Sequence, residues 1–125
     1  MRLTICITAA AVLCAGSSPA LAKGSPFQLK LTTWTFTDKD GNKVKESIDA
    51  KGNYIANTTA GKHLDHGTAV MKGAKACFNS KMDREGEVCW TTRPVTVGHS
   101  MATVSDKGEK LTVTRVKYTP LKMSK

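Results

Sequence analysis

The sequence lacks the short motifs that mark most catalytic and cofactor sites. It has no G-x-S-x-G nucleophile elbow, no H-E-x-x-H zinc motif, no C-x-x-C redox pair and no glycine-rich phosphate loop. Adjacent pairs such as His99 with Ser100, or Asp65 with His66, are too common to indicate a base held beside a nucleophile. We therefore expect a protein that is not an enzyme and that carries no cofactor.

Long apolar segments are also lacking, apart from one at the N-terminus. Arg2 precedes an uncharged apolar stretch over 3–16, which is too short to span a hydrocarbon core that needs about 20 residues. Ala20-Leu21-Ala22 follows, and its small residues suit a signal peptidase. The sequence therefore predicts a signal peptide over 1–22 and a single β domain over 23–125. The protein is expected to be periplasmic or secreted, with no transmembrane segment in the mature chain.

Cysteine is scarce, with four residues in the whole chain. Cys6 and Cys14 fall within the predicted leader, and Leu13 disfavours lipid attachment at Cys14, which normally follows a small residue. Cys77 and Cys89 remain, and an even pair in an oxidising compartment favours a disulfide. Closing a loop of about 13 residues would stabilise the domain by roughly 3 kcal/mol.

The alternation of side chains around the two cysteines supports this pairing. In an antiparallel hairpin the neighbours of the facing cysteines share the face opposite the sulfurs. That face would then carry large apolar groups on both strands, as a packed sheet requires. The predicted facing pairs are Cys77 with Cys89, Ala76 with Trp90, and Phe78 with Val88.

No segment has the periodicity of an amphipathic helix, and short alternating runs separated by polar turns take its place. The first run covers 27–36, where the apolar positions shift phase once, as they do at a β-bulge. Polar turns are expected at 38–42 and 51–53, and a longer loop at 57–67. Pro94 lies in a connection, because proline cannot donate to a central ladder.

These runs amount to seven or eight strands at spacings of roughly 8 to 12 residues, which is typical of a β-sandwich or barrel. A closed meander leaves no exposed sheet edge, and phase shifts in the first and last long strands would help them curve together. We therefore predict an all-β fold, a small antiparallel up-and-down β-barrel with a sandwich as the alternative.

Histidine is as scarce as cysteine, and two of the three histidines lie close together. His63, Asp65 and His66 offer nitrogen and carboxylate ligands to Zn²⁺, Cu²⁺ or Ni²⁺, and His99 completes a set of four if the loops meet. On a regular strand His63 and His66 point to opposite faces, so joint coordination requires a turn at this place. The alternative is ordinary hydrogen bonding at the surface.

Acidic residues are few, with 10 against 19 basic ones and a formal net charge of +9 at pH 7. The excess of basic residues is spread along the chain, which predicts attraction to anionic envelope components or to an acidic protein. The alternative is that these basic residues only form a solvated surface. Nucleic acid is not expected as a partner, because export removes the protein from it and no recognition motif is present.

Aromatic residues are also few, and most of them fall in predicted strands. They can line a ligand cavity or fill the core of a barrel that has no cavity, and the sequence is compatible with both interpretations. The residues concerned are Trp34, Phe36, Tyr54, Phe78, Trp90 and Tyr118.

Several short segments resemble uncharacterised small exported proteins of Gram-negative bacteria, a likeness that covers most of the mature chain and implies no activity. The general build is similar to lipocalin-like barrels and to periplasmic lysozyme inhibitors, by analogy of fold alone. The Ser-Gly inhibitory loop of those inhibitors is missing here, and the cysteines are placed differently. The segments are Trp34, Asp40-Gly41, Gly52-Asn53-Tyr54, His66-Gly67-Thr68, Cys77 and Cys89-Trp90.

The sequence thus favours a non-enzymatic periplasmic or secreted binding protein, or an envelope-associated module, of unknown ligand. A rigid barrel would carry contact loops near 63–67 and 93–100. Two alternatives stay open: a periplasmic metal-binding protein that uses the histidine cluster, and a periplasmic enzyme inhibitor.

Overall fold

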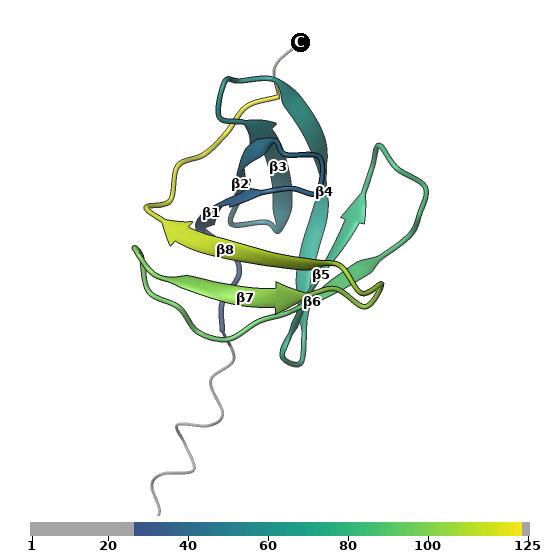
Figure 1. The fold of residues 1–125 in the computed structure, drawn as a ribbon, viewed down its shortest axis with the longest axis vertical. Helices are drawn as coiled ribbons and strands as arrows, with labels where there is room; N and C mark the ends of the chain where they lie inside the picture. The colour runs from purple at the N-terminus through teal and green to yellow at the C-terminus, as the bar shows by residue number, and fades with distance from the viewer. Residues whose placement is uncertain (1–26, 124–125) are drawn as a thin grey trace, which may run out of the picture.

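The computed structural model describes residues 27–123, which form eight antiparallel β-strands (Figure 1). The predicted signal peptide over 1–22 lies outside the described residues. Within 27–123 no helix is long and apolar enough to cross a membrane. The strands are β1 (Thr32–Thr37), β2 (Lys43–Ile48), β3 (Asn53–Thr58), β4 (His63–Lys72), β5 (Lys75–Ser80), β6 (Val88–Thr91), β7 (Ser100–Val104) and β8 (Lys110–Val116).

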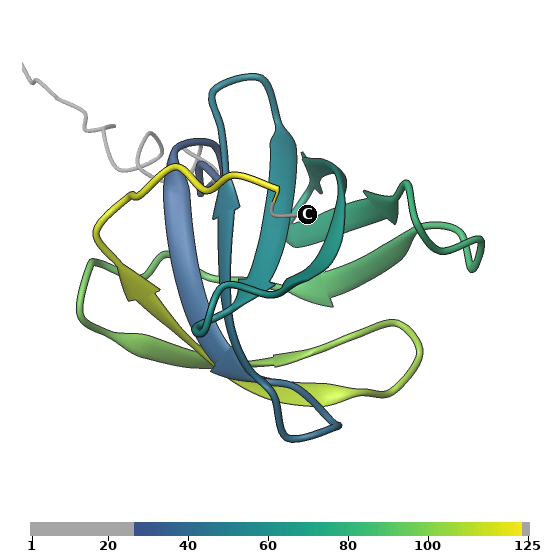
Figure 2. The ribbon, with the colours of Figure 1, turned by 90° about the horizontal axis from the view of Figure 1, so that it is seen from above.

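Strands β1 to β6 pair in the order of the sequence, β7 pairs with β8, and β8 returns to pair with β1, so the sheet order is β6-β5-β4-β3-β2-β1-β8-β7. The two remaining edges meet where Trp90 bridges Ser105. There the backbone N–H of Asp106 donates to the carbonyl oxygen of Cys89 at 2.9 Å. The chain is therefore a nearly closed up-and-down barrel, as the strand spacing predicts (Figures 1 and 2).

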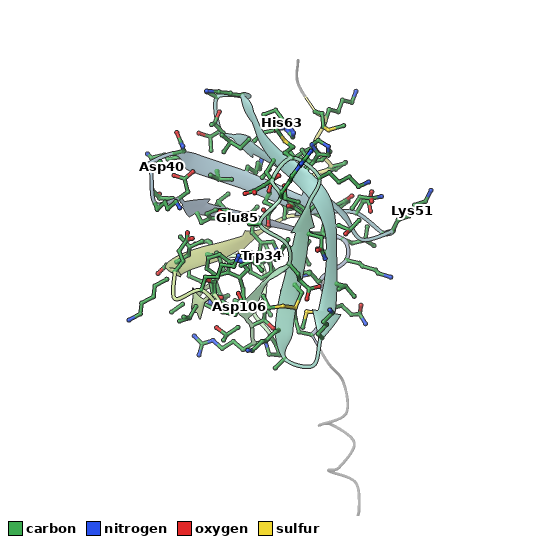
Figure 3. The ribbon with its side chains drawn as sticks, turned by 90° about the vertical axis from the view of Figure 1, so that its right-hand side faces the viewer. Trp34, Asp40, Lys51, His63, Glu85 and Asp106 are labelled. Atoms are coloured by element: carbon green, nitrogen blue, oxygen red, sulfur yellow. A yellow bond between two sulfur atoms is a disulfide. The ribbon has the colours of Figure 1, made fainter. Side chains whose placement is uncertain are left out.

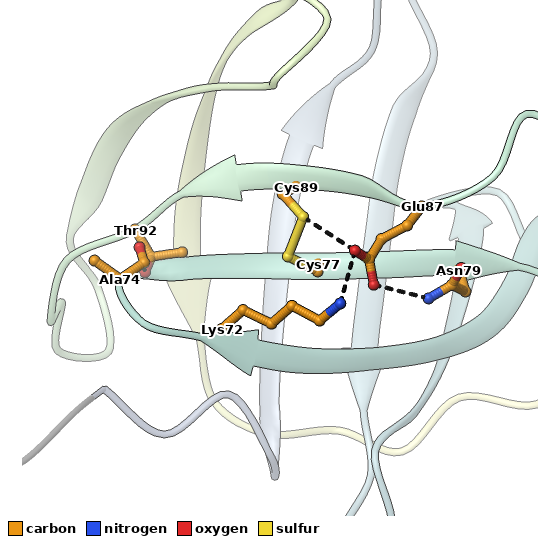
Figure 4. The surroundings of a disulfide bond; sticks show 7 residues. All are labelled: Lys72, Ala74, Cys77, Asn79, Glu87, Cys89 and Thr92. Atoms are coloured by element: carbon orange, nitrogen blue, oxygen red, sulfur yellow. Dashed lines mark hydrogen bonds and ion pairs between the residues drawn. A yellow bond between two sulfur atoms is a disulfide. The ribbon is translucent and has the colours of Figure 1, made fainter.

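The disulfide joins β5 to β6 on the outside of the barrel (Figure 4). Cys77 and Cys89 face each other with their Cα atoms 3.9 Å apart. Beside them Glu87 makes an ion pair with Lys72 at 2.9 Å. The register predicted from sequence is confirmed, and the side chains opposite the sulfurs all line the barrel interior: Ala76, Phe78, Val88 and Trp90.

One end of the barrel is filled by the segment that precedes β1. Phe27 packs edge-on against Trp34 with ring centroids 5.9 Å apart, and the guanidinium of Arg115 lies 5.8 Å from the Phe27 ring. Arg115 also donates to the carbonyl oxygen of Val95 at 2.8 Å. The strand expected over 27–31 is wrong, because Leu31 adopts a φ of 62° and turns the chain there before β1 begins.

The opposite end carries the turns between β1 and β2, β3 and β4, β5 and β6, and β7 and β8. The turn predicted at 38–42 is present, where Asp38 Oδ1 accepts the backbone N–H groups of Asp40 and Asn42. The loop expected over 57–67 is shorter than predicted. β3 continues to Thr58 and β4 begins at His63, because both strands find ladder partners across the sheet.

The C-terminal segment runs back over the outer side of the barrel (Figure 2). The backbone N–H of Thr119 donates to Thr33 Oγ1 at 2.8 Å, and the Asn57 amide donates to the carbonyl oxygen of Lys122 at 2.9 Å. This segment therefore lies along the outer faces of β1 to β3.

Candidate functional site

The barrel encloses a cavity of about 270 Å³. Its inner part is lined by Leu29, Trp34 and Val113, next to the filled end, and it extends to the turns that hold Glu85 and Glu109. Interior space of this size arises because several inward positions carry small side chains, among them Ala76 and Thr103, which leave the centre unfilled. The cavity is thus open at one end and closed at the other.

Aromatic rings form much of the wall. Five of the seven aromatic residues of the chain line the cavity, and Tyr54 meets Phe78 edge-on with centroids 5.1 Å apart. Tyr118, which was grouped with them from sequence, lies elsewhere. It borders a separate hollow of about 110 Å³ outside the barrel, beneath Pro120 and Leu121. The alternation of apolar residues therefore predicts the lining rings well, except where the chain has left the sheet.

Two carboxyl groups face the interior from neighbouring positions in the ladder. Glu46 on β2 pairs with Ala56 on β3, and Ala56 pairs with Asp65 on β4. Because paired residues point to the same face of a sheet, both carboxyl groups reach the cavity on either side of the small Ala56 side chain.

Asp65 is held in place by three donors. Tyr54 donates its hydroxyl to Oδ2 at 2.7 Å, Ser80 donates to Oδ1 at 2.5 Å, and the backbone N–H of His66 donates to Oδ1 at 2.9 Å. Ser80 Oγ in turn accepts the backbone N–H groups of Met82 and Asp83. The carboxylate is therefore tied both to the wall and to the turn at the cavity mouth.

Glu46 is in a different situation. No hydrogen bond to its carboxyl group is found among residues 27–123, and its half-buried side chain borders the cavity. Burial, helped by the negative charge of Asp65, raises the pKa of Glu46 to about 8. Burial and the hydrogen bond to Asp65 likewise raise the pKa of Tyr54. Near neutral pH Glu46 can therefore hold a proton, and it can lose that proton to water when a cation binds beside it.

The cavity mouth is also acidic. Six of the ten acidic residues in the chain line the cavity, and neither a lysine nor an arginine does, although the chain carries a net charge of +9. Lys107 reaches the mouth, where its ammonium group donates to the carbonyl oxygen of Glu85 at 3.4 Å. Figure 3 shows Asp40 at the edge of the molecule opposite Lys51, with Glu85 and Asp106 between them. The acidic lining residues are Asp38, Glu46, Asp65, Asp83, Glu85 and Glu109.

The predicted metal ligands are only partly brought together. Asn57 pairs with His63 while Ala56 pairs with Asp65, so Leu64 is an extra residue and β4 is bulged there. The bulge, rather than the turn expected from sequence, places His63 Nε2 3.0 Å from His66 Nδ1 on the outer face. His63 Nδ1 lies 2.8 Å from Asn57 Oδ1.

Asp65 and His99 do not join the two histidines. Asp65 points into the barrel, and His99 lies in the connection from β6 to β7, where its carbonyl oxygen accepts the backbone N–H of Arg115 near the filled end. Among residues 27–123 the cluster of three potential ligands within 4.8 Å is Cys77, Glu87 and Cys89, whose sulfurs are already joined to each other. A site made by all four predicted residues stays a prediction.

Glu46 was missed from the sequence, although a signal for it exists. Val44, Glu46 and Ile48 alternate along one strand, and the flanking pair is buried. A carboxyl group between two inward-facing apolar residues must also face inward, because side chains on a strand repeat every two positions. An acidic residue on an apolar strand face is unusual, and it indicates a polar site in the interior of the barrel.

Comparisons with protein-family models, with curated proteins and with solved structures find no significant match. The cavity itself combines an aromatic wall, two inward carboxyl groups and an acidic mouth, on a chain that is otherwise basic.

Proposed function

We propose that this chain is an exported, non-enzymatic binding protein that takes one small molecule into the interior of its barrel. The observation that carries the proposal is the cavity of about 270 Å³, which reaches from the acidic mouth to Trp34. Barrels of about eight strands are either filled by side chains or hold one small ligand. Ligand pockets are typically concave and mostly apolar, with a few polar groups that orient the ligand, and this cavity has that composition.

Export is supported by the Cys77–Cys89 bond, since such bonds persist in oxidising compartments. The basic exterior supports a further part of the proposal, that the protein associates with anionic envelope surfaces while its interior stays available. Association of this kind weakens as salt is added, whereas binding inside a desolvated cavity depends much less on ionic strength.

The test uses N-phenyl-1-naphthylamine, an uncharged dye whose fluorescence rises in apolar surroundings. We expect the mature protein to bind it, and Val88→Phe to weaken binding at least ~10-fold, because the added ring fills the cavity that Val88 lines. The matched control is Val70→Phe, at a residue 49% exposed on the outer face of β4. Absent dye binding, or equal loss in both variants, would contradict the proposal.

A second candidate function is binding of a transition-metal ion by His63 and His66. It is favoured by the 3.0 Å between His63 Nε2 and His66 Nδ1, two nitrogens close enough to share one ion. Calorimetry with Zn²⁺ and Cu²⁺ tests it, with His63→Ala expected to abolish the heat and His99→Ala expected to keep it. Absence of heat with the unaltered protein removes this candidate.

A further inference from the structure

The distribution of charge inside the barrel is opposite to that of the whole molecule. A chain with 19 basic and 10 acidic residues lines a single cavity with six of the acidic ones and with no basic one, and Lys107 reaches only its mouth. Low-dielectric walls focus the field of such a cavity and raise the local concentration of cations at its mouth. An anionic ligand such as a fatty acid would meet repulsion along the whole path inward.

Between the mouth and the inner wall, two carboxyl groups face the ligand space, and neither belongs to an ion pair among residues 27–123. Tyr54 and Ser80 already donate their hydroxyl groups to Asp65. Glu46 has no hydrogen-bond partner among residues 27–123. A buried charge is costly unless it is paired, so a positively charged group between Glu46 and Asp65 would be stabilised by both. The N–H groups of an ammonium ion also supply the donors that are missing there.

The walls next to these carboxyl groups are aromatic. Tyr54 and Phe78, in edge-on contact, line the cavity together with Trp34 and Trp90. The faces of aromatic rings attract cations, and cages of rings are a recurrent means of holding ammonium groups. Rings and carboxyl groups together match a ligand with a positive head and an apolar body.

We infer that the ligand of this cavity is a small organic cation, an amine or quaternary ammonium on an apolar body, whose positive group lies between Glu46 and Asp65. This inference rests on the proposed function, that the barrel interior binds a small molecule. It adds the sign of the charge, the position of the charged group and the residues that select it.

Three probes with the same phenylethyl body and different charge test the inference by displacing N-phenyl-1-naphthylamine: 2-phenylethylamine, 2-phenylethanol and 3-phenylpropionate. We expect the amine to bind roughly 10- to 100-fold more tightly than the alcohol, the gain typical of a charged hydrogen-bonded contact, and the carboxylate to bind most weakly. If the dye binds but the alcohol or the carboxylate competes as well as the amine, the inference fails and the proposed function stands. If neither dye nor probes bind, both fail.

Substitutions distinguish the effect of Glu46 and Asp65 on ligand preference from the effect of the negative charge at the open end as a whole. Asp65→Asn is expected to reduce the preference for amine over alcohol to less than about 3-fold, because the charged acceptor is lost. Asp40→Asn removes the same charge from the same end of the barrel at a residue that does not line the cavity, and is expected to keep the preference. Equal loss in both variants would overturn the assignment to Asp65.

Glu46→Gln covers the case in which Asp65→Asn disturbs folding, since it leaves the bonds of Asp65 to Tyr54 and Ser80 intact. The probe here is benzyltrimethylammonium, whose charge does not change with pH. We expect Glu46→Gln to lower its affinity at least ~10-fold at about pH 9, where Glu46 is ionised in the unaltered protein. Unchanged affinity in a folded Glu46→Gln variant would overturn the assignment to Glu46.

Discussion

Glu46 and Asp65 reach the same cavity from β2 and β4, separated by the single strand that carries Ala56. The surroundings of the two carboxyl groups differ. Asp65 accepts three hydrogen bonds from the protein, whereas the carboxyl group of Glu46 faces the cavity without one among residues 27–123. Burial and the charge on Asp65 then raise the pKa of Glu46 to about 8, so one carboxyl group is anchored and the other is available.

Glu46 should make the protein less stable as the pH rises. Its pKa is about 8 when folded against an ordinary value of 4.5, so the folded state holds a proton that the unfolded state releases between these values. The stability that this proton confers is complete below about pH 4.5 and is lost as the pH rises through 8, a change of about 5 kcal/mol. Glu46→Gln removes this slope, so its unfolding free energy should exceed that of the unaltered protein at about pH 9.

Urea unfolding at about pH 5, 7 and 9 measures this difference. Glu85→Gln is the control, because Glu85 lies at the exposed mouth of the same cavity. Parallel pH profiles for Glu46→Gln and the unaltered protein would show that Glu46 is ionised in the folded state at neutral pH.

Tyr54→Phe should destabilise the protein by about 1–2 kcal/mol, because it removes the hydroxyl that donates to Asp65 at 2.7 Å and leaves a part-buried acceptor short of a donor. The ring itself, packed against Phe78, is kept. Tyr118→Phe is the matched control, at a tyrosine on the outside of the barrel. Equal denaturation midpoints for Tyr54→Phe and the unaltered protein would argue against the hydrogen bond.

Gly67→Ala should be among the most damaging small substitutions. Gly67 on β4 pairs with Ser80 on β5, and a Cβ added at Gly67 would overlap the backbone carbonyl of Asn79. Since backbone atoms must move to make room, we expect a loss of about 3 kcal/mol or more. Thr68→Ala, at the neighbouring exposed position, is expected to change stability by less than ~0.5 kcal/mol. Thermal unfolding of both variants gives the test. A large loss in Gly67→Ala with little change in Thr68→Ala assigns the effect to the close contact between β4 and β5.

The double substitution Cys77→Ala with Cys89→Ala should lower the unfolding free energy by roughly 3 kcal/mol, because the covalent link between β5 and β6 no longer restricts the unfolded chain. Guanidinium titrations with and without a reducing agent provide the measurement, and the double variant should be insensitive to the reductant. Ready alkylation of both thiols in the protein isolated from the oxidising compartment would contradict the bond.

The hairpin around the disulfide shows how much of the structure the alternation of residues along the sequence predicts. Facing Cys77 with Cys89 was enough to place Phe78 and Trp90 on the inner face, because side chains on a strand alternate and a one-residue slip would expose them. The same rule applied to Val44 and Ile48 would have placed Glu46 inside as well. Strand number and barrel topology followed from turn spacing in the same way.

The interior site needed the tertiary structure. His63, Asp65 and His66 were grouped as ligands because they are close in sequence, yet the bulge at Leu64 turns Asp65 inward and both histidines outward. A bulge depends on what the partner strand can accept, so it cannot be read from one strand alone.

The amino-acid sequence by itself determined the alternating faces, the polar turns, the paired cysteines and hence an antiparallel all-β fold, barrel or sandwich, since each depends on residues near one another along the chain. Only the folded barrel decided that Glu46 and Asp65 share one cavity, that the acidic turns gather at its mouth and that His99 stays apart from His63. Those relationships depend on how the sheet closes and on the space its inward side chains leave, and both are properties of all eight strands together.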